Sequence, residues 1–125
     1  MNDNKYKVVW IVDDDDAIRS MLQTVLETEG YQTRSFSQRD EFLPNIKDQE
    51  PDLVLLDILL GEDNGLDICR EIKTNSTIPV VLISGSECTD EEVRTSMADG
   101  YIRKPFDIAT IVSTTSLLTK VSKSF

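Results

Sequence analysis

The chain has 125 residues, a length that fits one globular domain with a single hydrophobic core. Hydrophobic residues make up 39% of it and charged residues 29%, which excludes a disordered composition. The formal net charge of −10 argues against direct binding of nucleic acid, which requires a basic surface. Because the N-terminus is polar and no apolar run approaches the about 20 residues that span a bilayer, we expect a cytoplasmic protein without a membrane segment.

The sequence has no histidine and two cysteines, Cys69 and Cys88. The lack of histidine removes the most familiar base and metal ligand. The two cysteines are too few and too far apart for a disulfide framework or a zinc site, and we expect both to be free thiols.

Strand-like and helix-like segments alternate along the chain. Apolar runs predict strands at residues 8–12, 52–57, 78–84 and 101–103, and alternation predicts an edge-like strand at 31–36. Helical spacing of apolar residues predicts helices at residues 16–30, 37–47, 66–75 and 106–121, with a further short helix from residue 90. Residues 61–65 have the composition of a loop. The alternation predicts a parallel sheet with helices on both faces, a doubly wound α/β sandwich.

Three local signals refine the expected helices. Asp15 or Asp16 can cap the first helix, since a carboxylate accepts hydrogen bonds from its free amides. Pro44 predicts a short, kinked or irregular second helix. Thr89 and Glu92 form a capping-box pattern at the start of the short helix.

Polar side chains end or directly follow four of the predicted strands. They are the acids beginning at Asp13 and Asp14, then Asp57, Ser84 and Lys104. Each has an ordinary reading when taken singly: a capping loop, a strand-end turn or a solvated lysine. Because the carboxyl ends of parallel strands form the binding crevice of such sheets, we expect these groups to converge. Carboxylates, a hydroxyl and an amine suit a hard divalent cation and a phosphoryl group.

These residues resemble the receiver domain of bacterial two-component response regulators. The resemblance rests on four motifs in order: Ile-Val-Asp13-Asp14, Leu-Leu-Asp57 with Gly65 eight residues later, Leu-Ile-Ser84-Gly85, and Tyr101-Ile-Arg-Lys104-Pro105-Phe106. It covers residues from about 7 to about 121 and implies a single receiver domain over 1–125. It also implies a flavodoxin-like three-layer sandwich with five parallel strands in the order 2-1-3-4-5.

The resemblance implies a role for each motif residue. Asp57 is the expected phosphoacceptor, a carboxylate nucleophile that forms an acyl phosphate. The expected ligands of Mg²⁺ or Mn²⁺ are Asp14, Asp57 and the backbone carbonyl of Leu59, with Asp13 holding a coordinated water.

The remaining motif residues are expected to act on the phosphoryl group or respond to it. Lys104 would pair with Asp57 and with a phosphoryl oxygen, and Ser84 would donate a hydrogen bond to the phosphoryl group. Tyr101 would switch its rotamer together with the hydroxyl of Ser84. The peptide bond between Lys104 and Pro105 is expected to be cis.

The implied function is that of a phosphorylation switch. A sensor histidine kinase or a histidine phosphotransfer protein would donate the phosphoryl group. The surface formed by the helix after Thr89, the strand at 101–103 and the last helix would then change, with a phosphorylation-dependent homodimer as an open expectation. Such a domain is not a metabolic enzyme, since it catalyses only its own phosphorylation and hydrolysis. A receiver fragment of a longer DNA-binding transcriptional regulator stays open as an alternative.

Two rival classes share parts of this pattern. A Mg²⁺-dependent phosphatase with an aspartate nucleophile would need a second acid two residues later, where this chain has Leu59. A flavodoxin-like module that binds FMN would need a phosphate loop rich in glycine and hydroxyls, where this chain has acids from Asp13 onward.

The chain departs from the usual receiver pattern at several positions. Met97 stands at a usual glycine, Gly61 stands at a frequent proline, and the stretch from Ser84 to Lys104 is slightly shortened. From Met97 and the shortened stretch we expect a short, mobile helix after Thr89 and a weakened or altered dimer. Leu59 and Ser86 are poorly suited to orient a hydrolytic water, which predicts a long-lived phosphorylated form.

Overall fold

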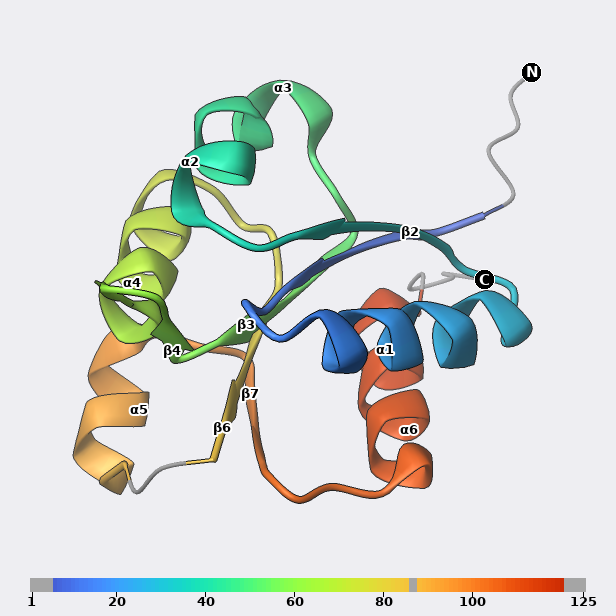
Figure 1. Ribbon diagram of the computed structural model, residues 1–125. Helices are drawn as coiled ribbons and strands as arrows, with labels where there is room; N and C mark the ends of the chain where they lie inside the picture. Colours follow the sequence, from blue (N-terminus) through green and yellow to red (C-terminus); the bar gives the residue numbers. More distant parts are fainter. Residues whose placement is uncertain (1–5, 86–87, 121–125) are drawn as a thin grey trace, which may run out of the picture.

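The sheet of this protein has five parallel strands in the order β2-β1-β3-β6-β7. The computed structural model describes residues 6–85 and 88–120 (Figure 1). The strands are β1 (Val8–Val12), β2 (Gln32–Phe36), β3 (Leu53–Asp57), β6 (Val80–Ser84) and β7 (Gly100–Arg103). In chain order these are strands one to five of the main sheet, so the predicted order 2-1-3-4-5 is confirmed.

Helices cover both faces of the sheet. They are α1 (Asp16–Thr28), α2 (Arg39–Phe42), the 3₁₀ turn η1 (Leu43–Asn45), α3 (Ile46–Gln49), α4 (Gly65–Asn75), α5 (Asp90–Ser96) and α6 (Ile108–Thr119). Figure 1 shows α1 and α6 on one side of the strands, and α2 to α5 on the other. The three-layer sandwich is thereby confirmed, and its single change of winding direction lies between β1 and β3.

The core divides into two clusters, one on each face of the sheet. Alternate residues of β1 point to opposite faces, so Trp10 belongs to one cluster and Ile11 to the other. Trp10 packs with Phe36 and Phe42 beneath α2 and α3, with ring centroids 5.0 and 6.4 Å from its own. Every residue of β3 is buried, as expected for the central strand of a covered parallel sheet.

The capping predictions are confirmed. The carboxylate of Asp15 accepts hydrogen bonds from the amides of Ala17 and Ile18 at the start of α1. Thr89 and Glu92 exchange both hydrogen bonds of a capping box at the start of α5. The segment with Pro44 is irregular, since η1 separates α2 from α3.

The loop predicted at 61–65 is wrong in part, because this stretch belongs to a small antiparallel hairpin. Its strands are β4 (Leu59–Leu60) and β5 (Asp63–Asn64), and α4 starts at Gly65 under an Asn64 cap. Two-residue strands are too short to leave an alternation signal in the sequence. The last helix begins at Ile108 instead of 106, and residue 121 lies outside the described residues.

Among residues 6–85 and 88–120, no helix combines the length and the apolar character needed to cross a membrane.

Helix α5 has only seven residues and ends at a backbone conformation that L-residues adopt with strain. Met97 closes this helix at φ +68°, in the left-handed region. The usual glycine of the family would adopt this conformation without a Cβ clash. The short helix predicted after Thr89 is thus confirmed, while its mobility and the altered dimer stay predictions.

We expect Met97→Gly to raise the free energy of unfolding by about 1 kcal/mol, since it removes a left-handed side-chain clash. Met97→Ala is the matched control, because it removes the same long side chain but keeps the Cβ. Urea unfolding measures the global change, and amide exchange across Val93–Ala98 reports local protection. Equal stability of the glycine and alanine variants would show that the conformation at Met97 is unstrained.

Candidate functional site

The chemistry-bearing residues gather at the carboxyl ends of the central strands. Asp13 directly follows β1, while Asp57 ends β3 and Ser84 ends β6. All three are buried, with exposed fractions of 5% or less. Lys104 directly follows β7, and its amide donates to the carbonyl of Ser84 over 2.8 Å. The structure therefore brings these four predicted site residues to one edge of the sheet.

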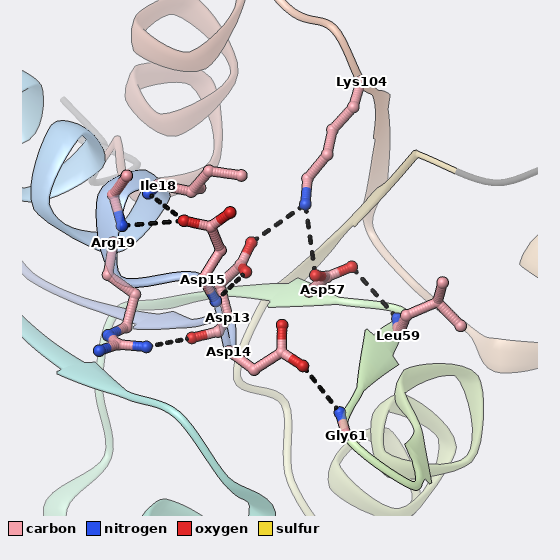
Figure 2. Close-up of polar contacts among 10 residues, drawn as sticks. Asp13, Asp14, Asp15, Ile18, Arg19, Asp57, Leu59, Gly61 and Lys104 are labelled. Carbon is pink, nitrogen blue, oxygen red and sulfur yellow. Dashed lines mark hydrogen bonds and ion pairs between the residues drawn. The ribbon is translucent and has the colours of Figure 1, made fainter.

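Lys104 connects the two buried acids. Its Nζ lies 3.2 Å from Oδ2 of Asp13 and 3.3 Å from Oδ2 of Asp57 (Figure 2). Burial alone would lower the pKa of the Lys104 ammonium, but the carboxylates of Asp13 and Asp57 outweigh it and raise that pKa. The amine is therefore a fixed positive charge within the site, and the ordinary reading of a solvated lysine does not apply.

Asp57 is held in an environment that disfavours its charge. Burial is the main cause that raises its pKa from 3.8 to about 6, and repulsion from Asp13 adds to it. Lys104 and a hydrogen bond from the amide of Leu59 to Oδ1, 3.1 Å long, oppose this effect. The protein alone thus incompletely compensates the carboxylate of Asp57, and an added cation would stabilise its charged form.

Three carboxylates can share one ion. Oxygen atoms of Asp13, Asp14 and Asp57 lie within 4.8 Å of one another. Two of these acids are buried and Asp14 is exposed, so the cluster opens to solvent on one side. This all-oxygen donor set fits Mg²⁺ or Mn²⁺, which keep several waters beside a few carboxylates. The role of the Leu59 carbonyl as a further ligand stays a prediction.

The hairpin contributes to the acid cluster in a way the sequence did not indicate. The amide of Gly61 donates to Oδ2 of Asp14 over 3.1 Å (Figure 2). A proline, frequent at this position in the family, has no amide hydrogen and could not make this bond. The departure at Gly61 therefore gives Asp14 a backbone donor.

Gly65 is required by a close approach of two backbone segments. A Cβ built on it would lie 2.4 Å from the carbonyl oxygen of Asp57 and 2.7 Å from the Cα of Ile58. Its amide also donates to the carbonyl of Ile58 over 2.7 Å. The motif position of Gly65 was recognised from the sequence, whereas this physical reason needed the fold.

The remaining predicted residues occupy the expected elements. The peptide bond between Lys104 and Pro105 is cis, as predicted. Tyr101 lies in β7 and packs against the core cluster that contains Trp10. Leu59 is 58% exposed at the rim of the site, and Ser86 lies outside the described residues.

The strand order and the polar crevice outside the carboxyl ends of the strands place this protein in the flavodoxin-like class of doubly wound α/β domains. The chain belongs to the response regulator receiver domain family, whose model matches residues 9–116.

Individual relatives agree with this assignment. The chain is 37% identical over 100 residues to the DNA-binding response regulator MtrA of Mycolicibacterium smegmatis, covering 78% of this chain and 44% of the relative. It is 35% identical to the transcriptional regulatory protein CseB of Streptomyces coelicolor, covering 84% and 46%. The chain thus spans less than half the length of these curated relatives.

Solved structures show the same fold. A putative response regulator from Chloroflexus aurantiacus superposes with a TM-score of 0.85 at 26% identity, covering 94% of this chain and 100% of the other. The receiver domain of NtrX from Brucella abortus superposes with a TM-score of 0.80 at 32% identity, covering 91% and 99%.

Proposed function

We propose that this receiver domain accepts a phosphoryl group on Asp57 and holds it with Mg²⁺ or Mn²⁺ as a signalling switch. The observation that carries the proposal is the bridge from Lys104 to both Asp13 and Asp57, beside the three clustered carboxylates. The donor is a phosphohistidine of a sensor histidine kinase or of a histidine phosphotransfer protein.

In this reaction a carboxylate oxygen of Asp57 attacks the phosphorus and forms an O–P bond. The P–N bond to the donor histidine breaks, and its electron pair stays on the imidazole nitrogen. The ammonium of Lys104 stabilises negative charge on a phosphoryl oxygen, and the hydroxyl of Ser84 donates to another. Bound Mg²⁺ supplies charge neutralisation between the phosphoryl group and the carboxylates of Asp13, Asp14 and Asp57. The domain catalyses only its own phosphorylation and hydrolysis.

The response passes from Ser84 and Tyr101 to the surface of α5, β7 and α6. Within residues 6–85 and 88–120, the buried hydroxyl of Tyr101 has no hydrogen-bond partner. A buried hydroxyl without a partner carries a desolvation cost, which favours an alternative rotamer that reaches water or a polar group. This supports the role of Tyr101 as a rotamer switch.

This domain affects DNA through another part of a longer regulator. Because MtrA carries the description of a DNA-binding response regulator and is matched over 44% of its length, we propose that this domain is the receiver part of a regulator of that kind. Its own net charge of −10 opposes contact with DNA, so DNA binding belongs to another part of such a regulator.

Intact mass spectrometry with acetyl phosphate tests the proposal. We expect a single phosphoryl adduct on the parent in Mg²⁺, little in EDTA, and none on Asp57→Asn. Asp52→Asn is the matched control, since this acid directly precedes β3, away from Asp57, and accepts a hydrogen bond from the amide of Val8. An adduct that persists in Asp57→Asn would place the acceptor elsewhere.

We expect Leu59→Asn to speed loss of phosphate from the phosphorylated domain by about tenfold, or about 1.4 kcal/mol of barrier. Leu59 is exposed at the rim, where an amide side chain can orient a hydrolytic water and leucine cannot. Phosphate release after removal of the donor is the measurement. Leu59→Met serves as an apolar control with unchanged release, and equal or slower release from Leu59→Asn would contradict the role of this position.

A further inference from the structure

Arg19 contacts the backbone of the acidic loop from within α1. Its Nη1 donates to the carbonyl oxygen of Asp13 over 2.6 Å (Figure 2). Its Nη2 pairs with the carboxylate of Asp16. The side chain is only 17% exposed, whereas Arg94, which makes the same type of pair with Glu91 in α5, is 74% exposed. Arg19 is therefore held in the structure, unlike a solvated arginine that pairs along a helix surface.

The contact with Asp13 acts on the geometry of the metal-site acids. The Asp13 carbonyl and the Cα atom of Asp14 belong to the same planar peptide unit. A donor that fixes this carbonyl therefore also fixes where the Asp14 side chain leaves the backbone. Asp13 is held at two further points, since its amide donates to the carbonyl of Phe36 and its Oδ1 accepts the amide of Asp15.

We propose that Arg19 is a positioning residue of the metal site, which holds the Asp13 carbonyl so that the carboxylates of Asp13 and Asp14 face Asp57. This inference rests on the proposed function, because it concerns the same cation site. Arg19 touches neither the phosphoryl group nor the cation in this role. It acts through the peptide unit between the two acids.

Electrostatic repulsion and positioning predict opposite effects of losing Arg19 on the affinity for Mg²⁺. A guanidinium near a cation site repels the cation, so its removal would tighten binding if charge alone mattered. Its removal loosens the loop and weakens binding if positioning matters, and partners of metal ligands are commonly worth tenfold or more in affinity. The carboxylate of Asp16 partly offsets the positive charge, which favours the positioning effect.

The test is Mg²⁺ titration of Arg19→Gln by calorimetry. We expect its dissociation constant to rise by about tenfold, and that of Arg19→Lys, which keeps one donor, to rise by less. Asp16→Asn leaves the bond to the Asp13 carbonyl in place and should bind Mg²⁺ within about twofold of the parent, as should Arg94→Gln. Unchanged or tighter binding by Arg19→Gln would overturn the proposal.

A second readout needs no metal. In EDTA, the amide of Asp15 should exchange about tenfold faster in Arg19→Gln than in the parent, because the loop that carries it loses the hydrogen bond that holds the Asp13 carbonyl and opens more often. Unchanged exchange at Asp15 would also overturn the proposal, even if Arg19→Gln is less stable overall. If the parent itself binds no Mg²⁺, the proposed cation site is wrong. Amide exchange at Asp15 still shows whether Arg19 holds the loop.

Discussion

Gly65→Ala is expected to lower the free energy of unfolding by about 3 kcal/mol, at the upper end of the cost of overpacking. The new Cβ would lie 2.4 Å from the carbonyl oxygen of Asp57 and 2.7 Å from the Cα of Ile58. Both atoms belong to the backbone, so no side chain can rotate away to relieve the clash. Urea unfolding at neutral pH in EDTA measures the loss.

Gly85→Ala is the matched control for this substitution. A Cβ at Gly85 would meet the side chain of Lys104 at 3.6 Å, an ordinary van der Waals distance. Its stability should stay within about 0.5 kcal/mol of the parent. Because the clash at Gly65 pushes on the residue that carries the proposed phosphoacceptor, Gly65→Ala should also slow adduct formation with acetyl phosphate. A Gly65→Ala variant as stable as Gly85→Ala would show that the two backbone segments can separate at little cost.

The sheet and the polar residues at its edge could be predicted because they leave local signals. Buried strands such as β3 appear as short apolar runs, and the polar residue that ends each run lies at the carboxyl edge of a parallel sheet. Asp13, Asp57, Ser84 and Lys104 were found in this way, and the structure brings them together.

Other features of the site depend on contacts between segments and leave no such signal. The donor from Gly61 to Asp14 exists only because the hairpin folds back toward β1, and its strands are too short for a detectable period. The contact of Arg19 with the Asp13 carbonyl involves backbone, so the identity of the accepting residue does not indicate it. The left-handed conformation at Met97 is an intermediate case, because the sequence showed an unusual residue but could not show its φ angle.

Asp57→Asn is expected to stabilise the metal-free domain by about 2 kcal/mol at pH 7.5. Each unit by which a folded-state pKa departs from the unfolded value is worth about 1.4 kcal/mol, and burial together with Asp13 raises the pKa of Asp57 from 3.8 to about 6. Asparagine keeps the size of the side chain and an acceptor for the Leu59 amide without the buried charge. The attraction to Lys104 is already included in this pKa, but an amide nitrogen in place of Oδ2 would face the Lys104 ammonium and reduce the gain.

The pH dependence of this gain has a definite sign. A folded-state pKa above the unfolded value means that the folded protein binds more protons between pH 3.8 and 6, so the parent loses stability as the pH rises through this window. The difference between Asp57→Asn and the parent should therefore be full above about pH 6 and nearly vanish at pH 3.8. Urea unfolding of both proteins in EDTA, at steps between these pH values, measures it.

Two comparisons test whether the buried charge of Asp57 is the cause of the gain in stability. Asp107 caps α6 and has a lowered pKa because of its side-chain and backbone hydrogen bonds with Thr110, so its contribution to stability should disappear as the pH falls, the opposite trend. Saturating Mg²⁺ should stabilise the parent more than Asp57→Asn, because the cation compensates the carboxylate that the variant lacks. If the gain from Asp57→Asn were the same at all pH values and unaffected by Mg²⁺, the buried charge of Asp57 would not be its cause. In that case the charged carboxylate of Asp57 would not destabilise the metal-free fold. Its burial would then give no electrostatic reason for a cation at the site.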